Sequence, residues 1–141
     1  MPTLLDSGAI IAAVHTRDSG HRHFRRLIES EPSVLLTSEA CVTEAIHILK
    51  TRGMVRGYRR VFALLRRLQV EVVCLTTRLR EIESLMEKYG DLPMDFADAT
   101  LVDLAGQRSL QRVITSDRRD FSVYRLPSGL AFEIAGLHGT S

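Results

Sequence analysis

The sequence alternates short apolar runs with longer amphipathic segments, and this alternation constrains the fold more than any other feature. Apolar runs with the length of buried strands lie at 3–5, 34–36, 71–75, 113–115 and 130–134. Helical periodicity predicts helices over 8–15, 20–30, 39–51, 55–68, 77–89 and 95–108. Ser7 and Ser38 are the predicted N-caps of the first and third helices. Because strands that alternate with helices form parallel sheets covered on both faces, we expect a three-layer α/β/α sandwich with a mostly parallel central sheet.

The 141 residues contain no linker, repeat or low-complexity stretch, so we expect a single domain over 1–136 and a flexible tail at 137–141. The longest uncharged run, 7–16, is far shorter than the roughly 18 residues that span a bilayer, and the first residues lack the basic region of a secretion signal. Cys41 and Cys74 have no metal-ligand spacing and are expected to pack as small apolar groups. We therefore expect a cytoplasmic protein that does not enter a membrane.

Two aspartates follow predicted strands. Asp6 ends the first strand, and Asp117 comes just after the run at 113–115, which ends in Thr115. In open parallel sheets, ligands and reacting groups gather in the crevice at the carboxyl ends of the strands. Taken singly, each aspartate is more simply explained as a strand-end or cap residue, because aspartate favours such positions. Their interest depends on the other acids.

One aspartate of the helix predicted over 95–108 occupies an unusual position. Asp98 projects from the middle of the apolar stripe, within about 60° of its neighbours on a helical wheel. Asp95 lies at the edge of that stripe, whereas Asp103 lies on the polar side, where exposure to solvent explains it. A carboxylate that faces a core is costly unless it is paired, hydrogen-bonded or bound to a metal. Asp98 is therefore either a structural acid bonded to amides or an arginine, or part of a site.

Glu44 lies on the boundary between the apolar and polar faces of its helix, which is also an ordinary place for a glutamate. The acids that can converge at the top of the sheet are Asp6, Glu44, Asp98 and Asp117, with Asp95 and Asp120 nearby. Like charges at close quarters repel unless they share protons or bind cations. Oxygen ligands without any histidine or cysteine spacing favour Mg²⁺ or Mn²⁺ over Zn²⁺. The pattern therefore indicates metal-assisted hydrolysis of a phosphodiester.

Four segments of the chain carry a family resemblance. They are LLDSGAIIA at 4–12, SEACVTEAIHIL at 38–49, MDFADATLVDLA at 94–105 and VITSDRRDF at 113–121. In this order and spacing the sequence resembles a PIN-domain ribonuclease, specifically a VapC-type toxin of a type II toxin–antitoxin system. The resemblance extends over 3–134, nearly the whole chain.

The resemblance implies catalytic roles for Asp6, Glu44, Asp98 and Asp117. It implies that Asp6, Asp98 and Asp117, with Glu44 as a possible further ligand, bind one or two Mg²⁺ ions, for which Mn²⁺ can substitute. A water activated by the metal would attack a phosphodiester of structured RNA, either tRNA or rRNA. The fourth motif contains two acids here, Asp117 and Asp120, so either can be the more important one. We treat Asp95, Asp120 and Thr115 as accessory residues.

The same resemblance implies partners. Toxins of this type usually form homodimers and are held inactive by a VapB-type antitoxin, which also binds operator DNA. DNA would therefore be only an indirect partner of this chain, through the antitoxin. The implied fold is the same α/β/α sandwich that the alternation predicts.

The basic residues are almost all arginine, with 17 Arg and 2 Lys. Guanidinium is the preferred group for phosphate recognition. Arginines occupy one side of the helix predicted over 55–68, and this stripe either binds RNA phosphates or an acidic antitoxin segment, or is simply a solvated basic face. The candidate RNA-binding residues are Arg118 and Arg119, beside Asp117, and Arg59 and Arg66 in the stripe.

Three functions other than a nuclease share single features with this sequence. The tripeptide Asp6-Ser7-Gly8 matches the aspartic-protease signature, but the helix predicted after it does not fit that nearly all-β fold. A phosphoaspartyl protein would need a lysine at a late strand end, and neither Lys50 nor Lys88 is so placed. A non-catalytic RNA- or protein-binding module on the same fold stays open, and it would bind RNA without cleaving it when Mg²⁺ or Mn²⁺ is added.

Overall fold

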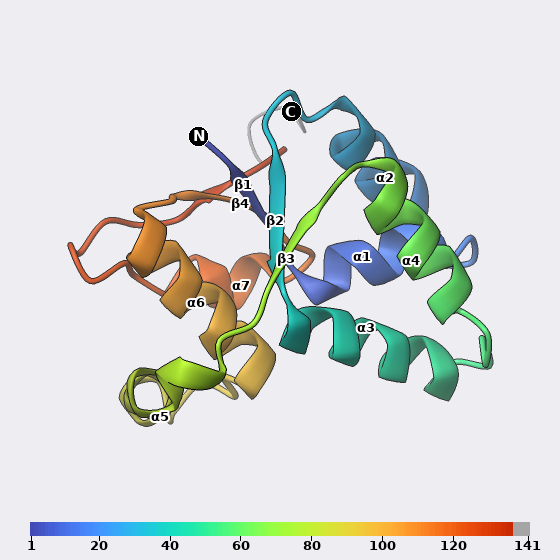
Figure 1. Cartoon of the computed structure of the whole chain (residues 1–141). Coiled ribbons are helices and arrows are strands. Elements are labelled where there is room, and N and C mark those ends of the chain that lie inside the picture. Colours follow the sequence, from blue (N-terminus) through green and yellow to red (C-terminus); the bar gives the residue numbers. More distant parts are fainter. Residues whose placement is uncertain (137–141) are drawn as a thin grey trace.

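Five parallel strands form the centre of the molecule, as seen in the computed structural model, which describes residues 1–136 (Figure 1). The strands are β1 (Thr3–Leu5), β2 (Leu35–Ser38), β3 (Glu71–Val73), β4 (Arg112–Ile114) and β5 (Glu133–Ile134). Their order in the sheet is β3-β2-β1-β4-β5, and an isolated antiparallel bridge joins Arg125 to Ala131. The predicted α/β/α sandwich with a parallel sheet is confirmed.

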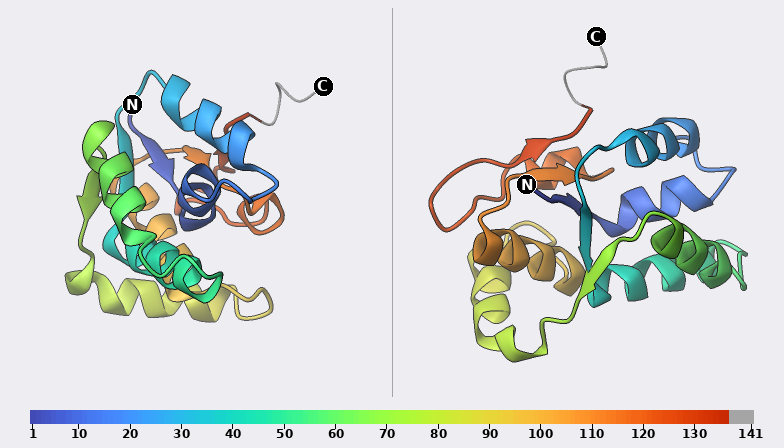
Figure 2. Two further views of the ribbon diagram at one scale, coloured as in Figure 1. Left: turned by 90° about the vertical axis from the view of Figure 1, so that its right-hand side faces the viewer. Right: turned by 45° about the horizontal axis from the view of Figure 1, so that its top comes forward.

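Helices cover both faces of this sheet (Figures 1 and 2). On one face lie α1 (Ser7–Val14), α2 (His21–Ser30) and α4 (Tyr58–Arg67). On the other face lie the 3-10 turn η1 (Thr76–Arg78), α5 (Leu79–Lys88), α6 (Phe96–Arg108) and α7 (Arg118–Phe121). The remaining helix, α3 (Glu39–Thr51), contributes side chains to the cores of both faces. None of the helices in residues 1–136 is long and apolar enough to cross a membrane.

Neighbouring residues of the strands point into different cores. Leu4 belongs to the core on the face covered by α6, whereas Leu5 belongs to the core on the face covered by α1, and both side chains are fully buried. Strands that are buried on both faces, as β1, β2 and β4 are, have continuous apolar sequences, and such runs predict them.

The direction of the connections reverses between β1 and β4. From β1 the chain moves outward to β2 and β3, and it then returns to place β4 on the other side of β1. At such a switch point the connections leave two neighbouring strands in opposite directions and open a crevice at their carboxyl ends. Because Leu5 is in register with Ile114, the residues that follow them, Asp6 and Thr115, are the next opposed positions.

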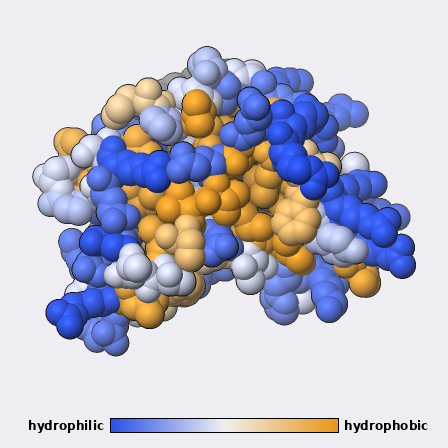
Figure 3. Space-filling view, in the orientation of Figure 1, coloured by the Kyte–Doolittle hydropathy of each residue, from blue (hydrophilic) through white to orange (hydrophobic). Residues whose placement is uncertain are grey.

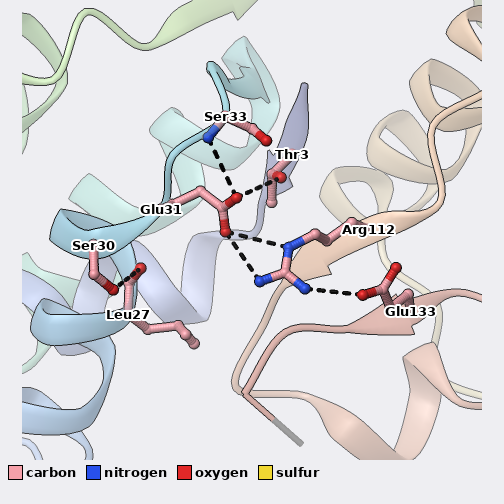
Figure 4. A network of polar contacts seen from close by, with 7 residues as sticks. All are labelled: Thr3, Leu27, Ser30, Glu31, Ser33, Arg112 and Glu133. Atoms are coloured by element: carbon pink, nitrogen blue, oxygen red, sulfur yellow. Dashed lines mark hydrogen bonds and ion pairs between the residues drawn. The ribbon is translucent and has the colours of Figure 1, made fainter. Parts of the chain in front are cut away.

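The opposite ends of the strands are held by a charged network (Figure 4). The Arg112 guanidinium donates two hydrogen bonds to Glu31 Oε2, at 3.2 and 3.1 Å, and one to Glu133 Oε1 at 2.9 Å. Glu31 Oε1 accepts a further hydrogen bond from the Thr3 hydroxyl at 3.3 Å. The network therefore ties the first residues of β1, β4 and β5 to the end of α2.

The structure corrects several local predictions. The cap of α1 is Asp6 and not Ser7, because the Asp6 carboxylate accepts the hydrogen bond from the Ser7 amide. The fourth helix begins at Tyr58 and not at residue 55, since the chain first turns through a Gly57 N–H to Met54 carbonyl bond. The short helix α7 was not predicted, and the last strand is shorter than the run at 130–134.

The two cysteines differ in their exposure to solvent. Cys41 is buried, as predicted, but Cys74 is exposed, so the prediction that it packs as a small apolar group was wrong. The reason is that β3 is the edge strand and ends at Val73, which leaves the next residue uncovered. The tail predicted at 137–141 lies outside the described residues, and the extent of the domain stays a prediction.

Candidate active site

The carboxyl ends of β1 and β4 bring Asp6 and Thr115 together. Asp6 is 3% exposed, and its two oxygens accept hydrogen bonds from the Ser7 amide at 2.8 Å and from the Thr115 hydroxyl at 2.7 Å. Each carboxylate oxygen has a second acceptor site, so Asp6 can still bind a cation while these bonds hold it in place. The burial of this side chain follows from the position of β1 at the middle of the sheet.

The loop after β4 presents the next acids. Asp117 is the N-cap of α7 and accepts a hydrogen bond from the Asp120 amide at 3.1 Å, while its own amide donates to Thr115 Oγ1 at 2.9 Å. The Thr115 hydroxyl therefore connects Asp6 to Asp117. Gly8 packs against the same loop, where a Cβ would overlap the Ser116 hydroxyl in its present rotamer.

The start of α6 supplies two further acids, Asp95 and Asp98. Asp95 is the N-cap of this helix and accepts a hydrogen bond from the Asp98 amide at 2.8 Å. Asp98 is 8% exposed, and its Oδ2 accepts a hydrogen bond from the Tyr124 hydroxyl at 3.2 Å. One oxygen each of Asp98, Asp117 and Asp120 lies within 4.8 Å of the others. A divalent cation with oxygen ligands at about 2.0–2.6 Å can bridge such a group.

Glu44 enters the cluster from α3. Its carboxylate is half-buried and accepts a hydrogen bond from the Ser7 hydroxyl, and Asp95 stands beside it. The five candidates Asp6, Glu44, Asp95, Asp98 and Asp117 thus interact with one another at the crevice. The structure brings together all the acids that the sequence indicated, and their catalytic roles stay predictions.

The pKa values of Asp6, Glu44, Asp98 and Asp117 are raised, so their charged forms are disfavoured. Burial, the largest cause, and the neighbouring carboxylates together raise the pKa of Asp6 to about 6 and that of Asp98 to about 8. Burial and Asp95 raise the pKa of Glu44 to about 7, and burial also raises the pKa of Asp117. Within residues 1–136, none of the ion pairs includes one of these acids. A cluster in which buried Asp6 and Asp98 meet half-buried carboxylates is suited to bind a divalent cation.

An open groove of ≈ 510 Å³ leads to one side of the cluster. Glu44 and Asp95 line it, together with residues at the start of α3, after β3 and at the start of α6. Phe96, which also lines the groove, is 47% exposed. The groove therefore places an exposed aromatic ring next to two of the acids.

The candidate RNA-binding arginines lie in two places. Arg118 and Arg119 are exposed on α7, directly after Asp117. Arg59 and Arg66 are exposed on α4, which covers the other face of the sheet (Figure 1). The structure thus separates a pair of arginines beside the acids from a pair on a distant helix.

Sequence reasoning missed two hydroxyl groups and misread one acid. Ser7, which the sequence predicts as a helix cap, instead donates a hydrogen bond to Glu44. The contact of Tyr124 with Asp98 depends on tertiary packing, which sequence periodicity does not show. Asp103 is not solvated: it is 8% exposed and accepts two hydrogen bonds of 3.0 Å from Arg78. The turn η1 carries Arg78 over the polar side of α6, which the helical wheel could not show.

The chain is similar to several known proteins. The family model described as PIN domain matches residues 3–126. Ribonuclease VapC26 of Mycobacterium tuberculosis is 27% identical over 135 residues, which cover 93% of this chain and 98% of that protein.

Two solved structures share the fold. Mycobacterium tuberculosis VapC20, described as a toxin that cleaves the sarcin–ricin loop, matches with a TM-score of 0.75 and 22% identity over 83% of this chain and 91% of its own. A toxin–antitoxin complex from Klebsiella pneumoniae matches with a TM-score of 0.64 and 18% identity over 85% of this chain and 90% of its own. At these identities the structural likeness supports the fold.

Proposed function

Because this chain belongs to the PIN domain family, we propose that it is a metal-dependent endoribonuclease and the toxin of a toxin–antitoxin pair. The observation that carries the proposal is the cluster of buried and half-buried carboxylates at the switch point between β1 and β4. Hydroxyl and amide groups hold these acids, and no ion pair of the described residues compensates them. Its similarity to Ribonuclease VapC26 supports the choice of RNA as the substrate.

The acids fit a divalent cation. Asp98, Asp117 and Asp120 present carboxylate oxygens close enough together to share one ion, and Asp6 stands beside them. All the ligands are hard oxygens, which favours Mg²⁺, with Mn²⁺ as a substitute. When bound, such an ion lowers the pKa of water and neutralises negative charge on a phosphoryl group.

Other residues of the chain would orient the acids and accept a proton. Thr115 and the Ser7 amide hold Asp6 in one orientation, so that its free lone pairs point to a fixed place. Glu44 is the candidate to accept a proton from the attacking water, because its carboxylate lines the open groove next to Asp95. The Ser7 hydroxyl orients the Glu44 carboxylate from behind.

RNA would be held by its phosphates and by one base. Arg118 and Arg119 are placed to bind a phosphate next to the acids, and Arg59 and Arg66 can add charge attraction from α4. Phe96 offers a surface on which an unpaired base can stack. We propose a loop of tRNA or rRNA as the target, in the cytoplasm, since the likeness includes a toxin that cleaves an rRNA loop.

A protein partner would have a surface to occupy. Between α3, α4 and the edge strand β3 lies an apolar groove of ≈ 740 Å³, whose lining includes Val42, Phe62, Val70 and Val72. Apolar side chains gather on this side of the molecule (Figure 3). We propose that a VapB-type antitoxin binds the toxin and inhibits it, and that two toxin chains form a homodimer. The similarity to a toxin–antitoxin complex supports the antitoxin.

The proposal is tested by incubating the purified full chain with total cellular RNA and mapping the new 5′ ends. We expect cleavage at few sites when Mg²⁺ or Mn²⁺ is present and none when EDTA removes it. Binding of RNA without cleavage in both metals would instead indicate the non-catalytic module. Cleavage that persists in EDTA would contradict the metal-dependent mechanism.

A further inference from the structure

Tyr124 joins two of the acids, although it is not itself acidic. Its side chain is fully buried, and its hydroxyl donates to Asp98 Oδ2 at 3.2 Å. Its backbone amide donates to the Asp120 carbonyl at 3.0 Å. One residue therefore connects α6 with the segment after β4, which supply the acids that come within 4.8 Å of one another.

The ring of Tyr124 is held in place by aromatic neighbours. Its centroid lies 5.1 Å from that of Phe121 and 5.0 Å from that of Tyr89, and both contacts are edge-to-face. Such pairs have a preferred geometry, so the direction of the hydroxyl is determined by the packing of the core. Burial and the nearby acids raise the pKa of Tyr124, which keeps the phenol protonated and able to donate.

We infer that Tyr124 is a positioning residue that orients the Asp98 carboxylate for divalent-cation binding. A hydrogen bond to one carboxylate oxygen restricts rotation of the carboxylate and directs its remaining lone pairs. Side chains that orient metal ligands in this way typically change metal affinity 10- to 100-fold when they are removed. The inference rests on the proposed function only in taking Asp98 as a cation ligand.

The same cluster offers a matched control. The Tyr89 hydroxyl accepts a hydrogen bond from the Arg125 amide at 3.0 Å, and the Tyr89 ring packs edge-to-face with Tyr124. The substitutions Tyr124→Phe and Tyr89→Phe each remove one hydroxyl from this group of rings and keep the ring itself. Only the first removes a bond to an acid.

The test measures Mn²⁺ binding to the full chain without RNA, by electron paramagnetic resonance of the free ion, together with the thermal midpoint of each variant. We expect Tyr124→Phe to weaken Mn²⁺ binding roughly 10- to 100-fold and Tyr89→Phe to leave it unchanged. Combined with Asp98→Asn, Tyr124→Phe should cause little further loss, because it acts through Asp98.

Three results would overturn the inference: wild-type affinity in Tyr124→Phe, an equal loss in Tyr89→Phe, or no Mn²⁺ binding by the wild-type chain. The proposed function is judged separately. If the wild-type chain binds Mn²⁺ and responds to Tyr124→Phe but cleaves no RNA, the positioning role stands and the nuclease activity fails.

Discussion

The two ends of the sheet bury carboxylates in different ways. At the amino ends of the strands, the Glu31 side chain is 3% exposed and receives two hydrogen bonds from the Arg112 guanidinium. At the carboxyl ends, Asp6 is also 3% exposed, but its donors are a hydroxyl and a backbone amide. Neutral donors orient a carboxylate without cancelling its charge. The amino end is therefore built for stability, and the carboxyl end leaves negative charge for a cation to neutralise.

The same contrast occurs within a single helix. Asp98 and Asp103 both belong to α6, and each is 8% exposed. Arg78 binds Asp103 through both of its oxygens, whereas Asp98 has the Tyr124 hydroxyl and faces other acids. Exposure alone therefore does not distinguish a structural aspartate from one in a site. The charge of its partner does.

The largest expected effect is the loss of RNA cleavage when Asp98 is replaced by asparagine. Asp98→Asn should lower the rate of metal-dependent RNA cleavage by about 1000-fold, equivalent to about 4 kcal/mol, because a charged cation ligand is lost. Without metal, the variant should be at least as stable as the wild type, since repulsion among the acids is relieved. Cleavage assays in Mg²⁺ and thermal unfolding in EDTA measure the two quantities.

Asp103→Asn is the control for that experiment. It breaks a charge-assisted pair with Arg78 and should lower the thermal midpoint, while cleavage per folded molecule stays near the wild-type rate. If both variants lose activity to the same extent, the distinction between the two aspartates is wrong.

The sequence predicted the sheet well because buried parallel strands and amphipathic helices leave periodic patterns. It also predicted that Asp98 faces inward, since a carboxylate in an apolar stripe conflicts with the helical pattern, and Asp98 is buried. It could not predict the environment of Asp103, because Arg78 is distant in sequence and comes from a 3-10 turn. The contact of Tyr124 with Asp98 was missed for the same reason. Local periodicity shows which side chains face inward, and tertiary packing decides what they meet.

A second test uses the pH dependence of stability, because a buried carboxylate without a cationic partner, such as Asp98, should lower stability as it ionises. The ordinary pKa of Asp98, 3.8, applies to the unfolded chain, and burial raises the pKa to about 8 in the folded protein. Between these two pH values the folded state therefore binds more protons at Asp98 than the unfolded state does. The free energy of unfolding is consequently unaffected by Asp98 below pH 3.8 and falls as the pH rises toward 8. Allowing for partial screening by solvent, we expect the metal-free protein to lose about 2 kcal/mol between pH 5 and 7.

Metal should reverse this loss. Because the ligands must be deprotonated, Mn²⁺ or Mg²⁺ should raise the thermal midpoint more at pH 7 than at pH 5. Asp98→Asn should flatten the pH dependence measured by urea unfolding in EDTA. A metal-free wild type whose stability rises from pH 5 to 7 would show that the acids are compensated after all.

The smallest expected effect lies at the amino end of the sheet. Glu31→Gln removes the charge that Arg112 binds, and because the Arg112 side chain is 35% exposed, solvent limits the cost to about 1.5 kcal/mol. Glu133→Gln is the control, since Glu133 bonds the same guanidinium but its side chain is 53% exposed, and it should cost less than about 0.5 kcal/mol. Urea unfolding of the two variants gives both values, and cleavage per folded molecule should stay at the wild-type level in each. A loss of cleavage in Glu31→Gln would mean that the charged network at the amino ends acts on the acids at the carboxyl ends, and the division between a stabilising end and a reactive end would then fail.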